Sequence, residues 1–285
     1  MSSVTFTLIQ TSLHWENKQA NLQMLEEKIA GIKEKTQVVL LPEMFSTGFS
    51  MKPEMLAETM EGETVQWMKR VAAKKKIILA GSVIIADSDG QAVQNGQTAY
   101  YNRFIWMLPN GTYGYYDKRH LFAFAGEDKH YTPGTERFIA SVNGWKINLL
   151  VCYNLRFPVW ARQQASPPAP LQKRGELEPG TAFEYDALIY VANWPERRSH
   201  AWKTLLQARA IENQCYVIGV NRVGNDGNDI YHSGDSMVID PLGEMLYHKK
   251  DDEDIFTITL KKEDLQSVRE KFQFWRDADE FTILP

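Results

Sequence analysis

Strand-like and helix-like patterns alternate along most of this chain, and this alternation restricts the possible fold more than any other feature of the sequence. Apolar runs of strand length occur at Thr5–Gln10, Val38–Leu41, Ile77–Ile85, Ala187–Ala192 and Tyr216–Asn221. Helical spacing of apolar residues occurs at Asn17–Glu34, Thr64–Ala73 and Ala201–Asn213. Two hairpins are predicted, pairing Tyr100–Leu108 with Thr112–Tyr116 and Met237–Asp240 with Glu244–Tyr247. β-α units with covering helices predict a layered α/β fold.

Composition and charge exclude several classes of protein. The chain has 285 residues, 44% of them hydrophobic, so we expect one domain with a large core over residues 1–285. A net charge of -4 with interspersed signs provides no basic stripe for nucleic acid. No signal peptide follows Met1 and no apolar stretch approaches the ~20 residues that cross a bilayer, so we expect a cytoplasmic protein without membrane partners. Cys152 and Cys215 are too few for a disulfide framework, and the six histidines show no metal-ligand spacing.

Three chemically reactive side chains each follow the end of a strand-like run. Glu43 comes after Val38–Leu41, Lys118 after Tyr113–Tyr116 and Cys152 after Ile147–Val151. Taken singly, each has an ordinary explanation as a solvated loop acid, a surface lysine or a small core cysteine. Because the ends of parallel strands meet at one edge of an α/β sheet, their shared position predicts a common site.

Three motifs around these residues resemble the signatures of the nitrilase superfamily of carbon–nitrogen hydrolases. They are Leu41-Pro42-Glu43-Met44-Phe45, Tyr116-Asp117-Lys118-Arg119-His120-Leu121-Phe122 and Val151-Cys152-Tyr153-Asn154-Leu155-Arg156-Phe157-Pro158. The motifs follow the order and spacing of that superfamily, and the resemblance covers almost the whole chain. Trp194-Pro195, Arg269–Phe272 and Asp277–Asp279 also resemble the bacterial omega-amidase branch.

The resemblance implies a four-layer α-β-β-α sandwich that often pairs into a homodimer. It implies a catalytic triad of Glu43, Lys118 and Cys152. The fourth functional residue of the superfamily, a glutamate shortly before a Pro-Gly turn, falls on Glu127 rather than on the adjacent Asp128. A glutamate near Lys118 would hold the ammonium in place and keep it charged, whereas the alternative for Glu127 is a plain loop acid.

The residue types of this triad suit amide hydrolysis. An amide carbonyl is a poor electrophile, so its hydrolysis requires a strong nucleophile, a proton acceptor and a site for the oxyanion. A thiol with a free pKa near ~8.5 is mostly protonated at neutral pH, so Glu43 would act as its base. Lys118 and a backbone N–H beside Cys152 would stabilise the oxyanion, and a thioester would form and hydrolyse. This chemistry needs no metal or organic cofactor and gives His120 and His130 no catalytic step.

The omega-amidase resemblance implies a small amide substrate that carries an α-keto carboxylate, such as α-ketoglutaramate. The predicted substrate-binding residues are Tyr153, Asn193, Trp194 and Arg197, with Phe124, Tyr131, Arg156 and Arg198 as further candidates. A guanidinium matches a carboxylate in shape and charge. The alternatives are a surface role for each arginine and a core role for Trp194.

Two features depart from the pattern of relatives. Asn154 stands where relatives usually carry an acid, and we interpret it as a cap of the turn or helix start, which Asn provides nearly as well as Asp. If a charge there mattered to Cys152, activity would be lower. Residues 163–183 are rich in proline and polar residues without periodicity, which indicates an insertion. We interpret it as a tolerated surface loop rather than a polyproline ligand for a partner.

Two other functions remain open at this stage. The same triad would also serve hydrolysis of an aliphatic amide, an N-carbamoyl amine or a nitrile. A non-catalytic scaffold with the same fold is the alternative from another class, and it predicts that Cys152 reacts with an alkylating agent as slowly as Cys215.

Overall fold

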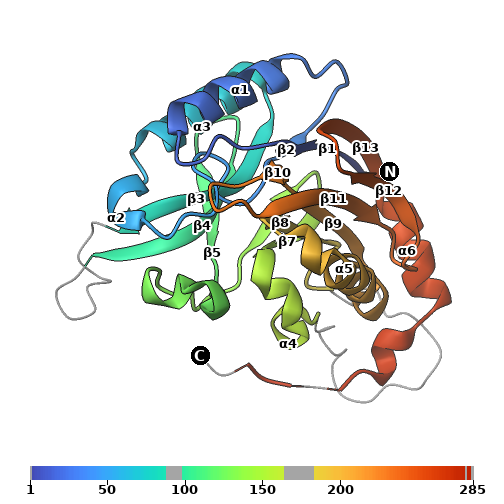
Figure 1. Ribbon diagram of the computed structural model, residues 1–285. Coiled ribbons are helices and arrows are strands. Elements are labelled where there is room, and N and C mark those ends of the chain that lie inside the picture. Colours follow the sequence, from blue (N-terminus) through green and yellow to red (C-terminus); the bar gives the residue numbers. More distant parts are fainter. Residues whose placement is uncertain (1, 88–97, 164–182, 280, 284–285) are drawn as a thin grey trace.

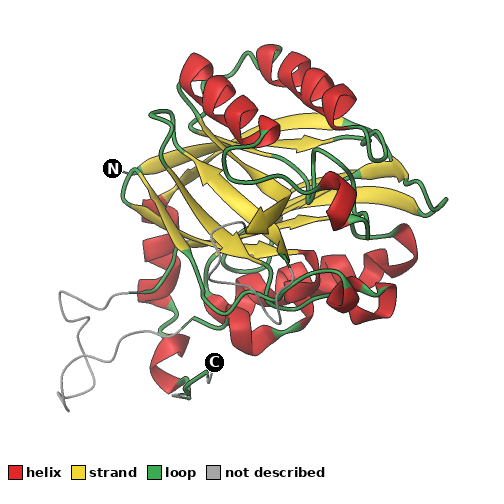
Figure 2. Cartoon of the chain, turned by 90° about the vertical axis from the view of Figure 1, so that its left-hand side faces the viewer, coloured by secondary structure: helices red, strands yellow, loops and turns green. Residues whose placement is uncertain are grey.

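The computed structural model describes residues 2–87, 98–163, 183–279 and 281–283. Within these residues, strands form two sheets that stack face to face (Figure 1), and helices cover the outer face of each sheet (Figure 2). This arrangement confirms the expected α/β class and the four-layer α-β-β-α sandwich. The insertion predicted at 163–183 falls almost entirely on residues 164–182, which lie outside the described residues.

The first sheet consists, in the described part of the chain, of six strands. In sheet order they are β13 (Asp254–Lys261), β1 (Ser3–Gln10), β2 (Val38–Leu40), β3 (Ile78–Asp87), β4 (Ala99–Met107) and β5 (Tyr113–Asp117). Strands β1, β2 and β3 are parallel, and β4 is antiparallel to both β3 and β5. Because two reversals restore the direction, β5 runs parallel to β2, and both strands end at the same edge of the sheet.

The second sheet has three parallel central strands. Its described strands, in sheet order, are β10 (Val223–Asn225), β11 (Tyr231–Ile239), β9 (Tyr216–Asn221), β8 (Ala187–Ala192), β7 (Trp145–Val151) and β6 (Ile139–Val142), with β12 (Met245–Lys250) paired to β11. Strands β7, β8 and β9 are the parallel set. The carboxyl ends of β7 and β8, which carry Cys152 and Asn193, therefore lie side by side.

The helices form the two outer layers and the connections near the strand ends. The α-helices are α1 (Lys18–Ala30), α2 (Pro53–Leu56), α3 (Glu63–Lys75), α4 (Pro158–Ala161), α5 (Ser199–Asn213) and α6 (Lys262–Lys271). The short 3-10 helices are η1 (Ala123–Ala125), η2 (Glu127–Lys129), η3 (Cys152–Arg156), η4 (Glu196–Arg198) and η5 (Phe274–Asp277). Helices α1 and α3 cover the first sheet, whereas α5 and α6 cover the second (Figure 1). Among the described residues, none of these helices has the length and apolar character of a membrane span.

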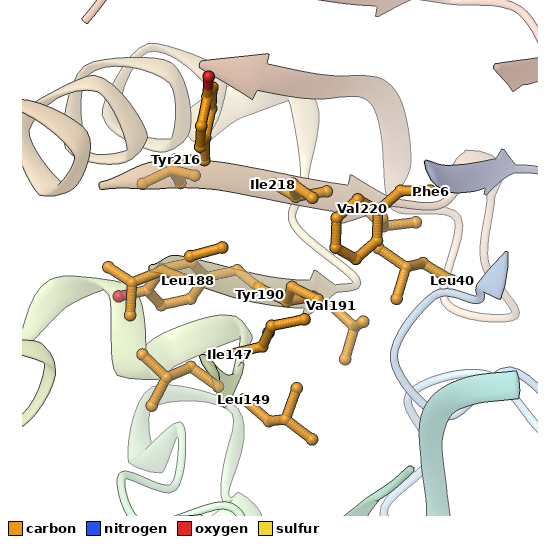
Figure 3. Close-up of a cluster of buried hydrophobic side chains, with 14 of the residues drawn as sticks. Phe6, Leu40, Ile147, Leu149, Leu188, Tyr190, Val191, Tyr216, Ile218 and Val220 are labelled. Atoms are coloured by element: carbon orange, nitrogen blue, oxygen red, sulfur yellow. The ribbon is translucent and has the colours of Figure 1, made fainter. Parts of the chain in front are cut away.

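Alternating side chains of the strands build two separate apolar layers. Along β2, Val38 and Leu40 belong to the core that includes both sheets, and Val39 belongs to the core beneath α1 and α3. Figure 3 shows Phe6 and Leu40 of the first sheet beside Val220 of the second. The central strands β2 and β3 bury nearly all of their side chains, so the few polar residues inside this sheet, such as Asn102 of β4, need partners within the protein.

Candidate active site

Glu43 leaves the first sheet through a turn that is bound to the neighbouring strand. The Leu41 N–H donates to the Ala80 carbonyl at 2.8 Å, and the Met44 N–H donates to the Ser82 hydroxyl oxygen at 2.8 Å. Met44 adopts a left-handed backbone with φ of 45°, which is unfavourable for a side chain of its size. These bonds to β3 hold the turn, and with it Glu43, in one orientation.

Lys118 follows β5 and is fixed by its own backbone on both sides. Its N–H donates to the Asn102 carbonyl at 3.0 Å, and its carbonyl accepts the Gly134 N–H at 3.0 Å. The side chain is buried and its ammonium lies 5.1 Å from the centre of the Phe49 ring. The backbone of Lys118 is therefore held in place, although its side chain is long and flexible.

Cys152 is the first residue of η3 and follows β7 directly, at a strained turn. Its φ is 42°, a left-handed conformation that residues with a side chain rarely adopt. The residue is only partly buried, whereas Cys215 is fully buried in the core. A nucleophile on a sharp turn after a strand is presented away from the sheet, where a reactant can approach it.

Two glutamates share the buried ammonium of Lys118. Its Nζ lies 3.0 Å from Glu43 Oε1 and 2.9 Å from both carboxylate oxygens of Glu127. All three side chains are buried. Burial disfavours the charge on Lys118, but the carboxylates of Glu127 and Glu43 outweigh it, so the pKa of Lys118 is raised above its usual value. The two carboxylates therefore favour the charged form of Lys118.

Glu127, rather than Asp128, is the acid that contacts Lys118. Its Oε2 also accepts the Phe122 backbone N–H at 2.5 Å, whereas Asp128 is exposed. Burial and the charge of Glu43 raise the pKa of Glu127, and Lys118 opposes that rise. The structure thus places Glu127 at the cluster that the resemblance implied.

The thiol of Cys152 adjoins this cluster and hydrogen-bonds to Glu43. Burial raises the pKa of the thiol well above its usual value, and the nearby negative charge of Glu43 adds to the effect, although Lys118 opposes it. The surroundings of Cys152 therefore favour the neutral thiol, with the Glu43 carboxylate beside it.

Sequence reasoning missed Asn102, which joins the two acids. Its Nδ2 donates to Glu43 Oε1 at 2.8 Å and lies 3.4 Å from Glu127 Oε1. The available signal was a lone amide in β4, an otherwise largely apolar and aromatic strand next to the one that leads to Lys118. A buried polar side chain in such a strand needs a partner, and the acids of this cluster are its partners.

Two of the predicted substrate-binding residues support the site from within. Asn193 donates its backbone N–H to Glu43 Oε2 at 2.8 Å and its Nδ2 to the Glu43 carbonyl at 2.6 Å. Trp194 is buried against Trp202, with ring centres 5.4 Å apart, and its Nε1 donates to the Arg198 carbonyl. Asn193 therefore orients Glu43, and Trp194 packs in the core beside it.

The remaining candidates differ in how closely they approach the cluster. Tyr153 follows Cys152 and packs against Phe122, with ring centres 4.9 Å apart. Arg197 is exposed, whereas Arg198 is half-buried over the Phe122 ring and close enough to Cys152 for their charges to interact. Arg156 is exposed and stacks over Trp194.

The two remaining aromatic candidates, Tyr131 and Phe124, lie in different environments. The Tyr131 hydroxyl donates to the Ser50 carbonyl at 2.6 Å, and Phe124 is 83% exposed.

Across the described residues, histidine, cysteine and acidic side chains form no group of three or more suited to a metal ion.

Comparison with protein families gives a match over nearly the whole chain. The family model described as carbon-nitrogen hydrolase matches residues 5–270. The chain is 41% identical to the omega-amidase YafV of Escherichia coli K12, over 99% of this chain and 100% of that protein. It is 29% identical to the 2-oxoglutaramate amidase of Bacillus subtilis, over 96% of each chain.

Solved structures show the same architecture. The CN-hydrolase superfamily protein XC1258 of Xanthomonas campestris, with an arsenic adduct in its active site, has a TM-score of 0.89 and 37% identity, covering 99% of this chain and 100% of that one. Nit3 of Saccharomyces cerevisiae, a nitrilase superfamily member, shares the fold with a TM-score of 0.77 at 24% identity, covering 95% of this chain and 94% of that one.

Proposed function

Because the chain belongs to the carbon-nitrogen hydrolase family, we propose that it hydrolyses a small omega-amide, such as α-ketoglutaramate, to the carboxylic acid and ammonia. The observation that carries this proposal is the buried cluster of Glu43, Lys118 and Glu127 against the partly exposed Cys152. The names of the omega-amidase and 2-oxoglutaramate amidase relatives support the substrate class.

In the first half-reaction, Cys152 acts as the nucleophile and Glu43 as the base. The thiol proton passes to the Glu43 carboxylate as the sulfur bonds to the amide carbon. The negative charge then lies on the former carbonyl oxygen, where Lys118 and the Tyr153 backbone N–H would stabilise it. When the C–N bond breaks, Glu43 returns the proton to the leaving nitrogen, which departs as ammonia and leaves a thioester on Cys152.

In the second half-reaction, a water molecule replaces ammonia. Glu43 accepts a proton from the water as its oxygen attacks the thioester carbon, and Lys118 again faces the developing oxyanion. Collapse of this species breaks the C–S bond, releases the carboxylic acid and returns the proton to the sulfur. Glu127 takes no proton in either step, because its role is to keep Lys118 charged and in place.

We assign recognition of the substrate carboxylate to Arg198 in preference to its exposed neighbour Arg197. Arg198 is half-buried over Phe122 and close enough to Cys152 for their charges to interact, and a guanidinium pairs with a carboxylate through two hydrogen bonds. Tyr153 would line the acyl chain through its ring, while Asn193 and Trp194 would shape the site from behind.

We further propose that the protein is a cytoplasmic homodimer that binds neither nucleic acid nor membranes. The resemblance to the nitrilase superfamily supports pairing, as do apolar side chains exposed on the helical layer of the second sheet, with Val159 58% and Ile211 54% exposed. Light scattering on the purified chain measures the dimer directly, and a monomer at micromolar concentration would contradict it.

The experiment that tests the reaction is ammonia release from α-ketoglutaramate by the wild-type chain and by Cys152→Ala. Glutamine, a nitrile and an N-carbamoyl amine serve as alternative substrates. Turnover of the keto amide that vanishes in Cys152→Ala supports the proposal. Activity confined to another substrate would replace the substrate class and keep the nucleophile, and inertness of the wild type on all four would contradict the amidase proposal.

The assignment of Arg198 is tested by the KM of its variant for the substrate that carries the carboxylate. Arg198→Met should raise KM for α-ketoglutaramate at least about tenfold, the effect of losing one charge-assisted contact. Arg197→Met is the matched control and should leave KM unchanged. The reverse result would assign the carboxylate to Arg197.

A further inference from the structure

Asn154 lies at a junction between the two segments that carry Cys152 and Lys118. It is fully buried, two residues after Cys152, and contacts residues two before and two after Lys118. Its Oδ1 accepts the Val151 backbone N–H at 3.0 Å and the Tyr116 hydroxyl at 3.1 Å, and its Nδ2 lies 3.0 Å from His120 Nδ1. One side chain therefore links the end of β7 to both sides of Lys118.

The direction of every hydrogen bond at this junction follows from its donors. A backbone N–H can only donate, so the oxygen of the Asn154 amide must face Val151. The Tyr116 oxygen accepts Trp160 Nε1 at 3.0 Å and the Arg119 N–H at 3.2 Å, which leaves its own hydrogen for Asn154. The Asn154 NH₂ group is then fixed toward His120.

His120 must therefore accept at Nδ1 and carry its proton on Nε2. Its ring stacks on Phe157, with centres 3.9 Å apart and planes within 8°, and meets the edge of Trp160. Burial and the neighbouring charge of Arg119 lower the pKa of His120 to about 4. A neutral imidazole suits an amide donor, whereas an imidazolium would repel it.

We infer that Asn154 is a positioning residue, which clamps the turn of Cys152 to the segment of Lys118 and holds His120 as its Nε2–H tautomer. The inference rests on the proposed function for the reaction that is positioned. An acid at this place would offer an acceptor to His120 and require the proton on Nδ1. The same clamp would then form with the opposite hydrogen-bond polarity, so the position requires shape rather than charge.

Histidine side-chain ¹⁵N NMR tests the tautomer without any substrate. Between about pH 5 and 8, wild-type His120 should stay neutral and protonated on Nε2. In Asn154→Asp, the proton should move to Nδ1, since the carboxylate accepts from it and outweighs the charge of Arg119. Asn228→Asp, an exposed site with the same chemical change, should leave His120 unaltered. Protonation of the wild type on Nδ1 would overturn the inference.

Kinetics test the positioning. Asn154→Ala should lower kcat by about 100-fold with KM within about twofold, whereas Asn154→Asp should retain kcat within about threefold. Tyr116→Phe, which keeps the ring and removes one donor, covers the case in which Asn154→Ala fails to fold, and should lower kcat by about threefold to tenfold. The clamp would be overturned if folded Asn154→Asp and Asn154→Ala lost kcat equally. A wild-type kcat in Asn154→Ala or in Tyr116→Phe would also overturn it.

Alkylation of Cys152 by iodoacetamide separates this inference from the proposed substrate. The alkylation rate should follow the same order, with Asn154→Asp close to wild type and Asn154→Ala about tenfold slower, because Glu43 no longer meets the thiol. If the chain leaves α-ketoglutaramate intact, the NMR and alkylation results still decide the role of Asn154.

Discussion

At the scale of single residues, burial and neighbouring charges favour the neutral form of the Cys152 thiol and the charged form of Lys118. The Cys152 thiol is buried next to two acids, Glu43 and Glu127. The cation that acts most strongly on it is Lys118, which those two acids already share. Reactivity therefore depends on proton transfer to Glu43 at the moment of attack rather than on a stored thiolate.

The first prediction concerns the pH dependence of that thiol. Because the pKa of Cys152 is raised, its thiolate fraction is small at neutral pH and still rising above about pH 8.5, where a free thiol is half ionised. The rate of iodoacetamide alkylation should thus climb between about pH 7 and 10 without a plateau. Mass spectrometry of each cysteine provides the rates, with buried Cys215 as an unreactive internal reference. A plateau below pH 8 would show a preformed thiolate instead.

The second prediction concerns Glu127. In Glu127→Gln, burial still disfavours the charge on Lys118 while its largest attraction is lost, so the pKa of Lys118 should fall. We expect kcat to fall at least about 100-fold, and the alkaline limb of the remaining activity to move to lower pH. The measurement is a pH profile of ammonia release. Asp128→Asn is the matched control, and an equal loss in it would mean that surface charge, not Lys118, is responsible.

At the scale of elements, the turns that carry the site are restricted by close packing of the backbone. Gly134 donates its N–H to the Lys118 carbonyl, and a Cβ on Gly134 would lie 2.2 Å from the Asp117 carbonyl oxygen. A main-chain oxygen cannot move aside as the end of a side chain does, so the segment of Lys118 would have to shift.

The third prediction follows from this contact. Gly134→Ala should destabilise the fold by about 1–3 kcal/mol and lower kcat, because displacement of Lys118 disturbs the oxyanion site. Gly31→Ala is the control, since a Cβ there meets only ordinary contacts at 3.5 Å and should change stability by less than about 1 kcal/mol. Thermal melts and kcat of both variants check the prediction. Unchanged kcat and Tm in Gly134→Ala would contradict it.

The sequence predicted most elements because their apolar patterns were strong. The predicted bounds of β8 and β9 coincide with the observed ones, and both hairpins are confirmed by the pairs Met107–Tyr113 and Ile239–Met245. Strand β13 was not predicted: it is a largely half-exposed edge strand, so its alternation is weak, and its partner β1 lies about 250 residues away in sequence. Such a pairing depends on the tertiary fold rather than on local pattern.

At the scale of the whole molecule, the site exists only because two sheets pack together. The first sheet supplies Glu43, Lys118 and Asn102, and the second supplies Cys152 and Asn193. The ends of strand-like runs predicted Glu43, Lys118 and Cys152 as site residues, because each of them follows an apolar run. Asn102 lies inside a strand, and the contact of Asn193 with Glu43 crosses 150 residues of sequence, so neither role follows from local spacing.

The last prediction treats the segment at 164–182, which the sequence indicates is an insertion. The residues that flank it are already joined: the Tyr185 N–H donates to Gln163 Oε1 at 3.1 Å, and the Gln163 N–H donates to Asn213 Oδ1 at 2.8 Å. Because the chain returns to the same place, a short Gly-Ser linker between Gln163 and Phe183 can close the gap, and a shorter loop costs less closure entropy by a few tenths to about 1 kcal/mol. We therefore expect kcat/KM within about twofold of wild type and an equal or slightly higher Tm.

A second variant tests whether stability depends on the hydrogen bonds of Gln163 rather than on the segment 164–182. Gln163→Ala in the full chain removes the two buried hydrogen bonds of its side chain, from the Tyr185 N–H and to the Asn213 carbonyl, and leaves these two backbone groups unpaired. The bond from the Gln163 backbone N–H to Asn213 Oδ1 remains. This variant should lower Tm more than the deletion does, by an amount equivalent to about 1–3 kcal/mol. If instead the well-folded deletion variant loses turnover while Gln163→Ala keeps it, the segment contributes to substrate binding, and the assignment of a tolerated surface loop is wrong.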